Sequence, residues 1–194
     1  PLLAFSEMLA ASGFNPGAFL ACYGMAECSL AVSFSPLGQG IQVDEVEAET
    51  LAVTQRAFPA LKPTDRAANA KEFVKCGFAL PGHSVEVRDD KGNTMPDRHV
   101  GTLYVKGPSV MSGYFNEPEL SREVLSADGW LNTGDLAYIA DESVIITGRQ
   151  KDLIIINGRN IWPQDLEYLA ESKPEVRTGD ASAFSVSDDD GEDK

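Results

Sequence analysis

The stretch from Gly148 to Glu167 reads GRQKDLIIINGRNIWPQDLE and divides the chain into two parts. A β-segment at Val144–Thr147 leads into it, and Gly148 is expected to form a turn. Charged residues then precede the apolar run Leu153–Ile156, which has the composition of a strand. Because a hydrophobic strand here follows a charged turn, we expect one domain to end near Arg149 and another to begin directly after it.

The residues that follow this strand predict a hairpin and a helix. Asn157-Gly158 is a turn dipeptide, and Pro163 with acidic neighbours is typical of a helix start. We expect this helix over Asp165–Lys173, ended by Pro174, and then a strand at Ala181–Val186. One helix and two strands are too few for a stable domain of their own. We therefore expect them to be the start of a larger α+β unit.

The composition excludes several classes of function. A net charge of −14 argues against nucleic acid or anionic lipid as a general partner. The three cysteines, Cys22, Cys28 and Cys76, have no metal-ligand spacing, and with two histidines a zinc site is not expected. Reduced thiols in a cytoplasmic setting fit best. No apolar run approaches the roughly 20 residues of a membrane span.

Both ends read as cut from a longer polypeptide. The chain opens at Pro1 without an initiator methionine and ends in the charged stretch Asp188–Lys194, which follows the predicted strand. The acidic run Asp188–Asp193 is expected to be a solvated turn rather than a partner-binding tail.

The first forty residues predict a helix, a strand and a glycine turn. Apolar residues at helical spacing predict a helix over Leu2–Ser12, with Gly13 as its stop. Phe19–Cys22 is short and apolar, which predicts a buried strand. Gly24 then allows a turn or a close approach to a ligand. Glu27 is either a magnesium ligand or an acid at a helix start, and the residues alone favour the helix start.

The segment Ile41–Glu72 has the weakest pattern. It is acidic, then interrupted by two prolines, then rich in alanine. One or two amphipathic helical turns at Val46–Val53 and an irregular surface excursion are both compatible with it. Its length and lack of period are typical of an inserted segment.

From residue 78 to residue 147 the sequence indicates β-structure. Val85 and Val87 alternate with charged residues ahead of a turn at Asp89–Gly92, and Leu103 and Val105 alternate in the same way. Leu120–Leu125 predicts a short helix. Short strands at such intervals indicate a small, mostly antiparallel sheet or barrel.

Two strands at the end of this region bring two charged residues together. Leu136–Ile139 and Val144–Thr147 are joined by a hairpin at residues 140–143, so Asp135 and Arg149 are expected at the same end. A carboxylate accepts hydrogen bonds from a vicinal diol such as ribose, and a guanidinium binds the diol or a phosphate. A surface ion pair without function is the equally weighted alternative.

Four motifs in this order resemble the adenylate-forming superfamily of acyl-CoA synthetases, peptide-synthetase adenylation domains and luciferases. They are the nucleotide and magnesium motif Tyr23-Gly24-Met25-Ala26-Glu27, the stretch Gly101–Gly107 with Gly113-Tyr114, the ribose-binding motif Trp130–Leu136, and the hinge motif Gly148–Asp152 with Asn157–Arg159.

Within that superfamily the chain is most similar to the fatty acyl-AMP ligases. Ala26 stands where CoA ligases carry threonine, and Lys151–Glu167 is typical of this branch. Ile41–Glu72 lies where these ligases carry an extra segment. The resemblance implies an α/β fold in which residues 1–149 are the C-terminal part of the large AMP-binding domain. Residues 41–72 are then the inserted segment, 78–147 a β-rich subdomain, and 150–194 the hinge and the first part of a small domain.

The resemblance also implies a role for each motif residue. The nucleotide would be held by Cys22, Tyr23, Gly24, Met25, Ala26, Asp135 and Arg149, with Tyr23 against the adenine and Asp135 on the ribose. Glu27 would hold Mg²⁺, and Lys151 would be the hinge about which the small domain turns. Ala26 lacks the threonine hydroxyl that the wider superfamily places near the phosphate.

The implied reaction joins a fatty acid to ATP as an acyl-adenylate and passes the acyl group to an acyl carrier protein or a synthase carrier domain. The phosphate loop and the adenylation lysine of the superfamily are absent from these residues, so the isolated chain is not expected to form adenylate. One alternative acceptor is CoA, which would make the protein an acyl-CoA synthetase. A non-catalytic interaction module is an alternative of another class.

Overall fold

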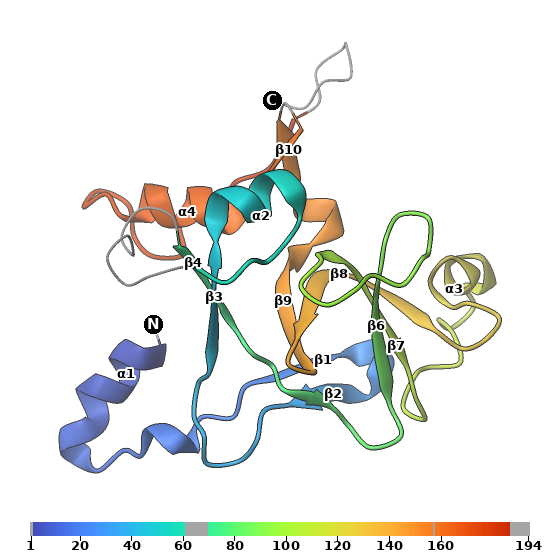
Figure 1. Ribbon diagram of the computed structural model, residues 1–194, viewed down its shortest axis with the longest axis horizontal. Coiled ribbons are helices and arrows are strands. Elements are labelled where there is room, and N and C mark those ends of the chain that lie inside the picture. Colours follow the sequence, from blue (N-terminus) through green and yellow to red (C-terminus); the bar gives the residue numbers. More distant parts are fainter. Residues whose placement is uncertain (1, 61–69, 157, 187–194) are drawn as a thin grey trace.

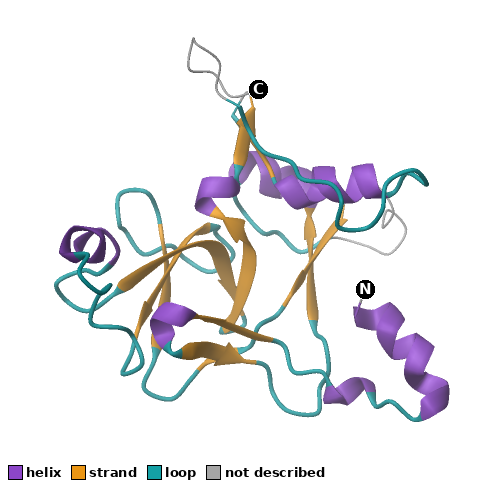
Figure 2. Cartoon of the chain, turned by 180° about the vertical axis from the view of Figure 1, so that it is seen from behind, coloured by secondary structure: helices purple, strands orange, loops and turns teal. Residues whose placement is uncertain are grey.

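The computed structural model describes residues 2–60, 70–156 and 158–186, and it has a mixed α/β fold (Figure 1). The four α-helices of the described residues lie at the outside of the molecule, and the central part is made of short antiparallel sheets (Figure 2). In chain order the described helices and strands are α1 (Leu2–Leu9), η1 (Ala10–Ser12), η2 (Pro16–Ala18), β1 (Cys22–Met25), η3 (Ala26–Cys28), β2 (Leu30–Phe34), β3 (Val43–Glu47), α2 (Ala48–Thr54), β4 (Ala70–Val74), β5 (Phe78–Ala79), β6 (Ser84–Arg88), β7 (Gly101–Lys106), α3 (Pro118–Val124), β8 (Leu131–Ala140), β9 (Ser143–Arg149), η5 (Gln150–Asp152), β10 (Ile154–Ile156), β11 (Arg159–Ile161) and α4 (Pro163–Glu171).

The central element is a four-stranded antiparallel sheet in the order β6-β7-β8-β9. The antiparallel sheet expected from the alternating residues is therefore confirmed. β8 and β9 are joined by a two-residue turn in which Asp141 and Glu142 have φ values of 51° and 61°. Such left-handed pairs match the twist of a tight hairpin. The register places Asp135 opposite Arg149 at the open end of the hairpin, as predicted.

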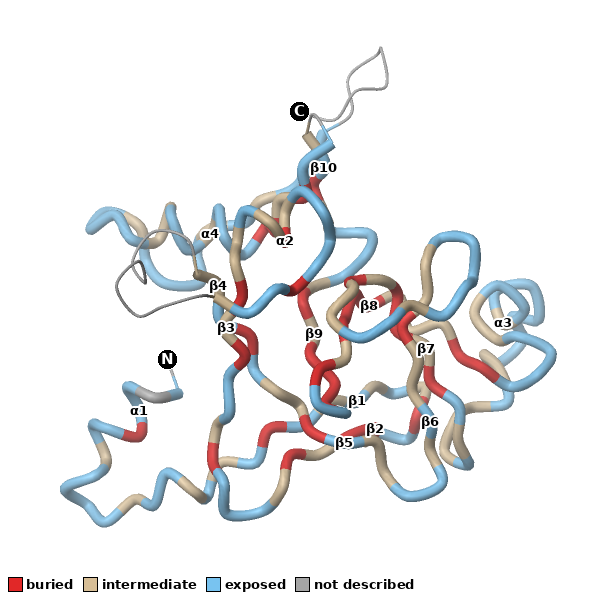
Figure 3. Tube along the Cα trace, viewed as in Figure 1, coloured by how far each residue is buried: buried red, intermediate tan, exposed pale blue. Residues whose placement is uncertain are grey.

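Alternate residues of β8 point to opposite faces of this sheet and enter two different cores. Leu136 and Tyr138 belong to a cluster with Val46, Leu51 and Trp162. Ala137 belongs to a cluster on the other face that is completed mainly by Val32, Leu103, Val105 and Val144. The buried positions follow β3, β7, β8 and β9, whereas α1, α3 and α4 are largely exposed (Figure 3).

The N-terminal part forms the predicted helix, but the predicted strand begins later. α1 and η1 end at Gly13, which has φ 81° and donates its N–H to Ala10. The run Phe19–Cys22 is not a buried strand, because Leu20 is 38% exposed and pairing starts only where Cys22 meets Phe34 on β2. The predicted strand start at Phe19 is therefore wrong by three residues, since β1 begins at Cys22.

The segment 41–74 is an ordered part of the core in its described residues. β3 pairs with β4 from Val43↔Val74 to Glu47↔Ala70, and α2 confirms the helical alternative for this stretch. Val46 and Leu51 are fully buried. An irregular surface excursion is therefore wrong for the described part, while residues 61–69 lie outside it.

The stretch 148–167 forms a short helical turn, a hairpin and a helix. Gly148 does not turn, since it continues β9 to Arg149, and this expectation was wrong. An added Cβ at Gly148 would lie 3.1 Å from Cδ1 of Trp162, so the glycine makes room for that ring. β10 and β11 pair across the predicted turn, with Gly158 at φ 73°; Asn157 lies outside the described residues.

The last described residues differ from the expectation. α4 spans Pro163–Glu171 and so begins and ends two residues earlier than predicted. Ala181–Val186 forms no strand in the described chain, since it has no neighbouring strand to pair with there. The acidic run Asp188–Asp193 is outside the described residues. Among the described helices, none is long and apolar enough to cross a membrane.

Candidate active site

Asp135 is the centre of a polar cluster built from three separate parts of the chain. The hydroxyl of Tyr23 on β1 donates to Asp135 Oδ2 at 2.6 Å. Nε of Arg149 on β9 lies 3.1 Å from Asp135 Oδ1. The structure thus brings together three of the residues that the sequence nominated, and the ion pair expected from the hairpin geometry forms.

Local hydrogen bonds fix the orientation of Asp135. The Thr133 hydroxyl accepts the N–H of Asp135 at 3.1 Å and donates to the carbonyl of Leu103 on β7 at 2.8 Å. Asn132 Oδ1 accepts the N–H of Gly134 at 2.9 Å, and Gly134 takes φ 71°. Side chains of this kind commonly bond to nearby backbone and form turns. The backbone therefore turns within β8 and directs the carboxylate toward β1.

The electrostatics of the cluster differ between its two donors. Burial, and then the hydrogen bond to Asp135, raise the pKa of Tyr23, so its hydroxyl remains a donor. The side chain of Asp135 is 10% exposed, whereas that of Arg149 is 60% exposed. The terminal nitrogens of Arg149 make no hydrogen bond with another described residue. They are open to a ligand that carries hydroxyls or phosphate.

Glu27 lies in the η3 turn directly after β1. Its Oε1 accepts a hydrogen bond from the hydroxyl of Tyr114 at 2.8 Å, and its Oε2 has no partner among the described residues. The described chain holds no group of three or more His, Cys, Asp or Glu side chains that could bind a metal. Mg²⁺ is usually held by one or two carboxylates together with substrate phosphates. The single half-open carboxylate of Glu27 fits that kind of site.

The other residues of the predicted nucleotide motif occupy varied positions. Met25 Sδ accepts from the Tyr23 hydroxyl at 3.9 Å, while Cys22 and Ala26 are exposed. Gly24 lies at a bulge, where an added Cβ would meet the carbonyl of Leu30 at 1.6 Å. The close approach of β2 therefore requires a glycine at this position.

Lys151 lies apart from this cluster in the described structure. It is exposed in η5 and makes no hydrogen bond or ion pair with another described residue. It lines an open cleft of about 350 Å³ together with α4 residues Pro163 and Gln164.

Two polar residues next to the cluster were not nominated as site residues from the sequence. Thr133 positions the backbone of Asp135, and Tyr114 bonds to Glu27. A threonine two residues before a functional aspartate is a signal for such a turn. Tyr114 belongs to one of the four motifs, but no local pattern gives its contact with Glu27, because that partner is 87 residues away.

Comparisons with known proteins identify the family of this chain. The profile of the family described as AMP-binding enzyme matches residues 6–115. A putative acyl-CoA synthetase of Caulobacter vibrioides is 50% identical over 96% of this chain and 32% of its own length. The medium-chain-fatty-acid–[acyl-carrier-protein] ligase JamA of Moorena producens is 33% identical over 90% of this chain and 31% of its own length.

The fold itself matches a solved structure from a study of fatty acyl-adenylate ligases from E. coli and L. pneumophila. The two superpose with a TM-score of 0.87 at 47% identity, over 94% of this chain and 32% of that one. The chain spans about a third of the length of the curated relatives it matches. The resemblance drawn from the four motifs is thus confirmed, and the chain belongs to the family of AMP-binding enzymes.

Proposed function

We propose that the full-length protein activates a fatty acid with ATP as an acyl-adenylate and passes the acyl group to an acyl carrier protein or carrier domain. The observation that carries this proposal is the cluster of Tyr23, Asp135 and Arg149, which suits a ribose and its phosphate. The similarity to fatty acyl-adenylate ligases supports the substrate class, and the similarity to JamA supports the acceptor.

Each residue then has a defined task. Asp135 accepts hydrogen bonds from the ribose hydroxyls, using lone pairs that remain beside Tyr23 and Arg149. Arg149 contacts the ribose or the α-phosphate, and Tyr23 flanks the adenine. The backbone of Cys22, Gly24, Met25 and Ala26 forms the rest of that wall.

Charge neutralisation at the phosphates lowers the barrier to attack by the fatty carboxylate. Glu27 would hold Mg²⁺ for this purpose, and the ion would offset the negative charge of the phosphates. Lys151 is assigned the pivot between adenylation and acyl transfer, a role that suits its exposed place in η5.

The same proposal divides the chain into two domains. Residues 1–149 belong to the large AMP-binding domain, with 41–72 inserted and 78–147 forming its β-rich part. Residues 150–194 are the hinge and the beginning of the small domain. The free thiols of Cys22, Cys28 and Cys76 support a cytoplasmic location.

Substitution of Asp135 tests the site directly. Asp135→Asn in the full-length protein removes a charged acceptor, and charge-assisted hydrogen bonds are worth about 1.5–3 kcal/mol. We therefore expect ATP to bind roughly 10- to 100-fold more weakly in calorimetry. Asp141→Asn is the matched control, since this exposed carboxylate lies at the other end of the same hairpin and bonds to Lys75. Unchanged ATP affinity in Asp135→Asn would reject the assignment.

CoA is the competing acceptor, favoured by the similarity to a putative acyl-CoA synthetase. The full-length enzyme with laurate and ATP distinguishes the two when CoA and a carrier protein are offered in parallel. We expect transfer to the carrier protein to dominate. Efficient formation of lauroyl-CoA would replace our proposal with that of an acyl-CoA synthetase.

A further inference from the structure

The carboxylate of Glu27 is held by a loop that is distant in the sequence. The hydroxyl of Tyr114 donates to Glu27 Oε1 at 2.8 Å across a separation of 87 residues. The N–H of Met111 also donates to the backbone carbonyl of Glu27 at 2.8 Å. Side chain and backbone of Glu27 are therefore both bound to the loop that leads into α3.

Tyr114 is itself fixed from α3. Its N–H donates to Ser121 Oγ at 2.8 Å, and that hydroxyl donates to the carbonyl of Glu117 at 2.7 Å. Gly113 precedes it with φ 148°, and an added Cβ there would lie 3.0 Å from Ser121 Oγ. The phenol thus reaches Glu27 from a loop whose path is constrained on both sides.

We propose that Tyr114 is a positioning residue for the magnesium ligand Glu27, a role that rests on the proposed function. Its hydroxyl occupies Oε1 and leaves Oε2 as the oxygen open to a cation. The neighbours that orient a metal-binding carboxylate typically change metal affinity 10- to 100-fold when they are removed. Tyr114 therefore couples the position of the α3 loop to the magnesium affinity of the nucleotide site.

The test measures binding without turnover. The full-length protein is titrated with α,β-methylene-ATP in a calorimeter, with EDTA and then over a range of magnesium concentrations. Tyr114→Phe should raise the magnesium concentration for half-maximal enhancement of nucleotide affinity about tenfold. The affinity in EDTA should stay as in the wild type, because the phenol bonds to the metal ligand.

Tyr104→Phe is the matched control. Tyr104 lies on β7 with its ring 4.5 Å from the Arg88 guanidinium, and its hydroxyl has no hydrogen bond within the described residues. The same loss of one oxygen there should leave the magnesium response unchanged. Combining Tyr114→Phe with Glu27→Gln should add nothing to the effect of Glu27→Gln alone, since the tyrosine acts through that carboxylate.

The outcomes separate the two levels of the proposal. A wild-type or tighter magnesium response in Tyr114→Phe overturns the role of Tyr114, as does an equal loss of affinity in EDTA. If Glu27→Gln leaves the magnesium response unchanged, the assignment of Glu27 in the proposed function fails instead. If Glu27→Gln shifts the response and Tyr114→Phe does not, Glu27 keeps its role and only the inference about Tyr114 is rejected.

Discussion

At the scale of single residues, Asp135 shows how a buried carboxylate is paired and oriented by its neighbours. Each of its oxygens has its own partner: the half-buried phenol of Tyr23 donates a hydrogen bond to one, and the largely exposed guanidinium of Arg149 forms an ion pair with the other. A buried charge without such partners costs several kcal/mol. These two partners therefore hold the carboxylate in place before any ligand binds.

The raised pKa of Tyr23 predicts that the folded state becomes less stable at alkaline pH. Burial and the bond to Asp135 raise its pKa above the ordinary phenol value of about 10. The unfolded chain then loses this proton at lower pH than the folded one. The stabilisation is complete below about pH 10 and declines as the pH rises above it.

Thermal unfolding of the full-length protein between pH 8 and pH 11 measures this effect. Between pH 8 and pH 11 we expect the unfolding temperature of Tyr23→Phe to fall less than that of the wild type. Tyr168→Phe, whose ring is 78% exposed, should follow the wild type. Equal slopes for Tyr23→Phe and the wild type would contradict this linkage.

At the scale of elements, Gly77 lies between two strands, β9 and β2. Its N–H donates to Ser143 Oγ at 3.1 Å and its carbonyl accepts from Val144 on β9 at 2.9 Å. An added Cβ would lie 1.9 Å from the carbonyl oxygen of Phe34 on β2. The space between these two strands therefore has no room for a side chain at position 77.

Substituting alanine at Gly77 should therefore be far more costly than at Gly92. Both glycines have a left-handed φ, of 76° and 83°, but the space around Gly92 is open. Left-handed strain alone costs about 1–2 kcal/mol, so Gly92→Ala should lower the unfolding temperature of the full-length protein by only a few degrees. Gly77→Ala adds a backbone collision and should prevent stable folding. Similar unfolding temperatures for both variants would refute this account.

A second contact between elements holds α4 against the two-stranded sheet of β3 and β4. Nζ of Lys71 lies 4.1 Å from the ring centroid of Trp162 and 2.6 Å from Asp165. Burial lowers the pKa of Lys71 although Asp165 opposes that change. The lysine therefore links the segment 41–74 to the first turn of α4.

Lys71→Met keeps the apolar stem and removes both electrostatic contacts. A cation–π contact is worth about 1 kcal/mol, so amides of Pro163–Glu171 should exchange with solvent roughly fivefold faster. Lys75→Met is the control, because Lys75 pairs with Asp141 rather than with α4. Hydrogen exchange with mass spectrometry on the full-length protein measures both. Unchanged exchange in α4 would show that Trp162 packing alone holds the helix.

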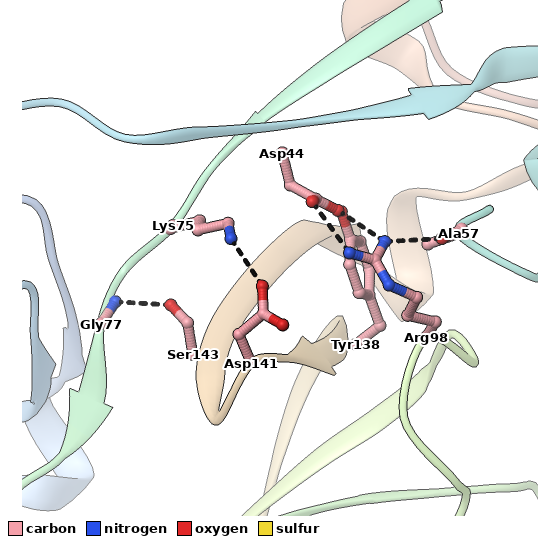
Figure 4. A network of polar contacts seen from close by, with 8 residues as sticks. All are labelled: Asp44, Ala57, Lys75, Gly77, Arg98, Tyr138, Asp141 and Ser143. Carbon is pink, nitrogen blue, oxygen red and sulfur yellow. Dashed lines mark hydrogen bonds and ion pairs between the residues drawn. The ribbon is translucent and has the colours of Figure 1, made fainter. Parts of the chain in front are cut away.

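At the scale of the whole molecule, a buried network ties β3 to the central sheet (Figure 4). Asp44 is 8% exposed and accepts two hydrogen bonds from Arg98, at 3.0 and 3.1 Å. The Tyr138 hydroxyl on β8 donates to the same carboxylate at 2.8 Å. Arg98 also donates to the carbonyl of Ala57 at 2.9 Å. Three separate segments thus meet at one charge.

Substituting Arg98 alone should destabilise the protein more than substituting both Arg98 and Asp44. Arg98→Met leaves a buried carboxylate with one donor, which costs about 3 kcal/mol. Adding Asp44→Asn should restore part of the unfolding temperature, because a neutral amide needs no ionic partner. The check is thermal unfolding of the full-length single and double variants. A double variant less stable than Arg98→Met would contradict this explanation.

Local patterns predicted the elements whose causes are local. The hairpin of β8 and β9 follows from alternating residues and a tight turn, and this places Asp135 opposite Arg149. β3 was missed because Asp44, Glu45 and Glu47 have low strand propensity. Its buried Asp44 is compensated by Arg98, 54 residues away, and no local pattern contains that partner.

The sequence by itself determined the α/β class, the antiparallel sheet, the order of the four motifs and the membership of the AMP-binding family. The antiparallel sheet follows from side-chain period and turn chemistry, which are properties of neighbouring residues. The α/β class and the family follow from the resemblance of the four motifs, in their order, to the adenylate-forming superfamily. Tertiary structure alone decided that Gly148 makes room for Trp162, that Tyr23 bonds to Asp135 and that Tyr114 bonds to Glu27. Such pairs depend on how the strands pack, because the hydrogen bond or the free space belongs to two residues that the chain keeps far apart.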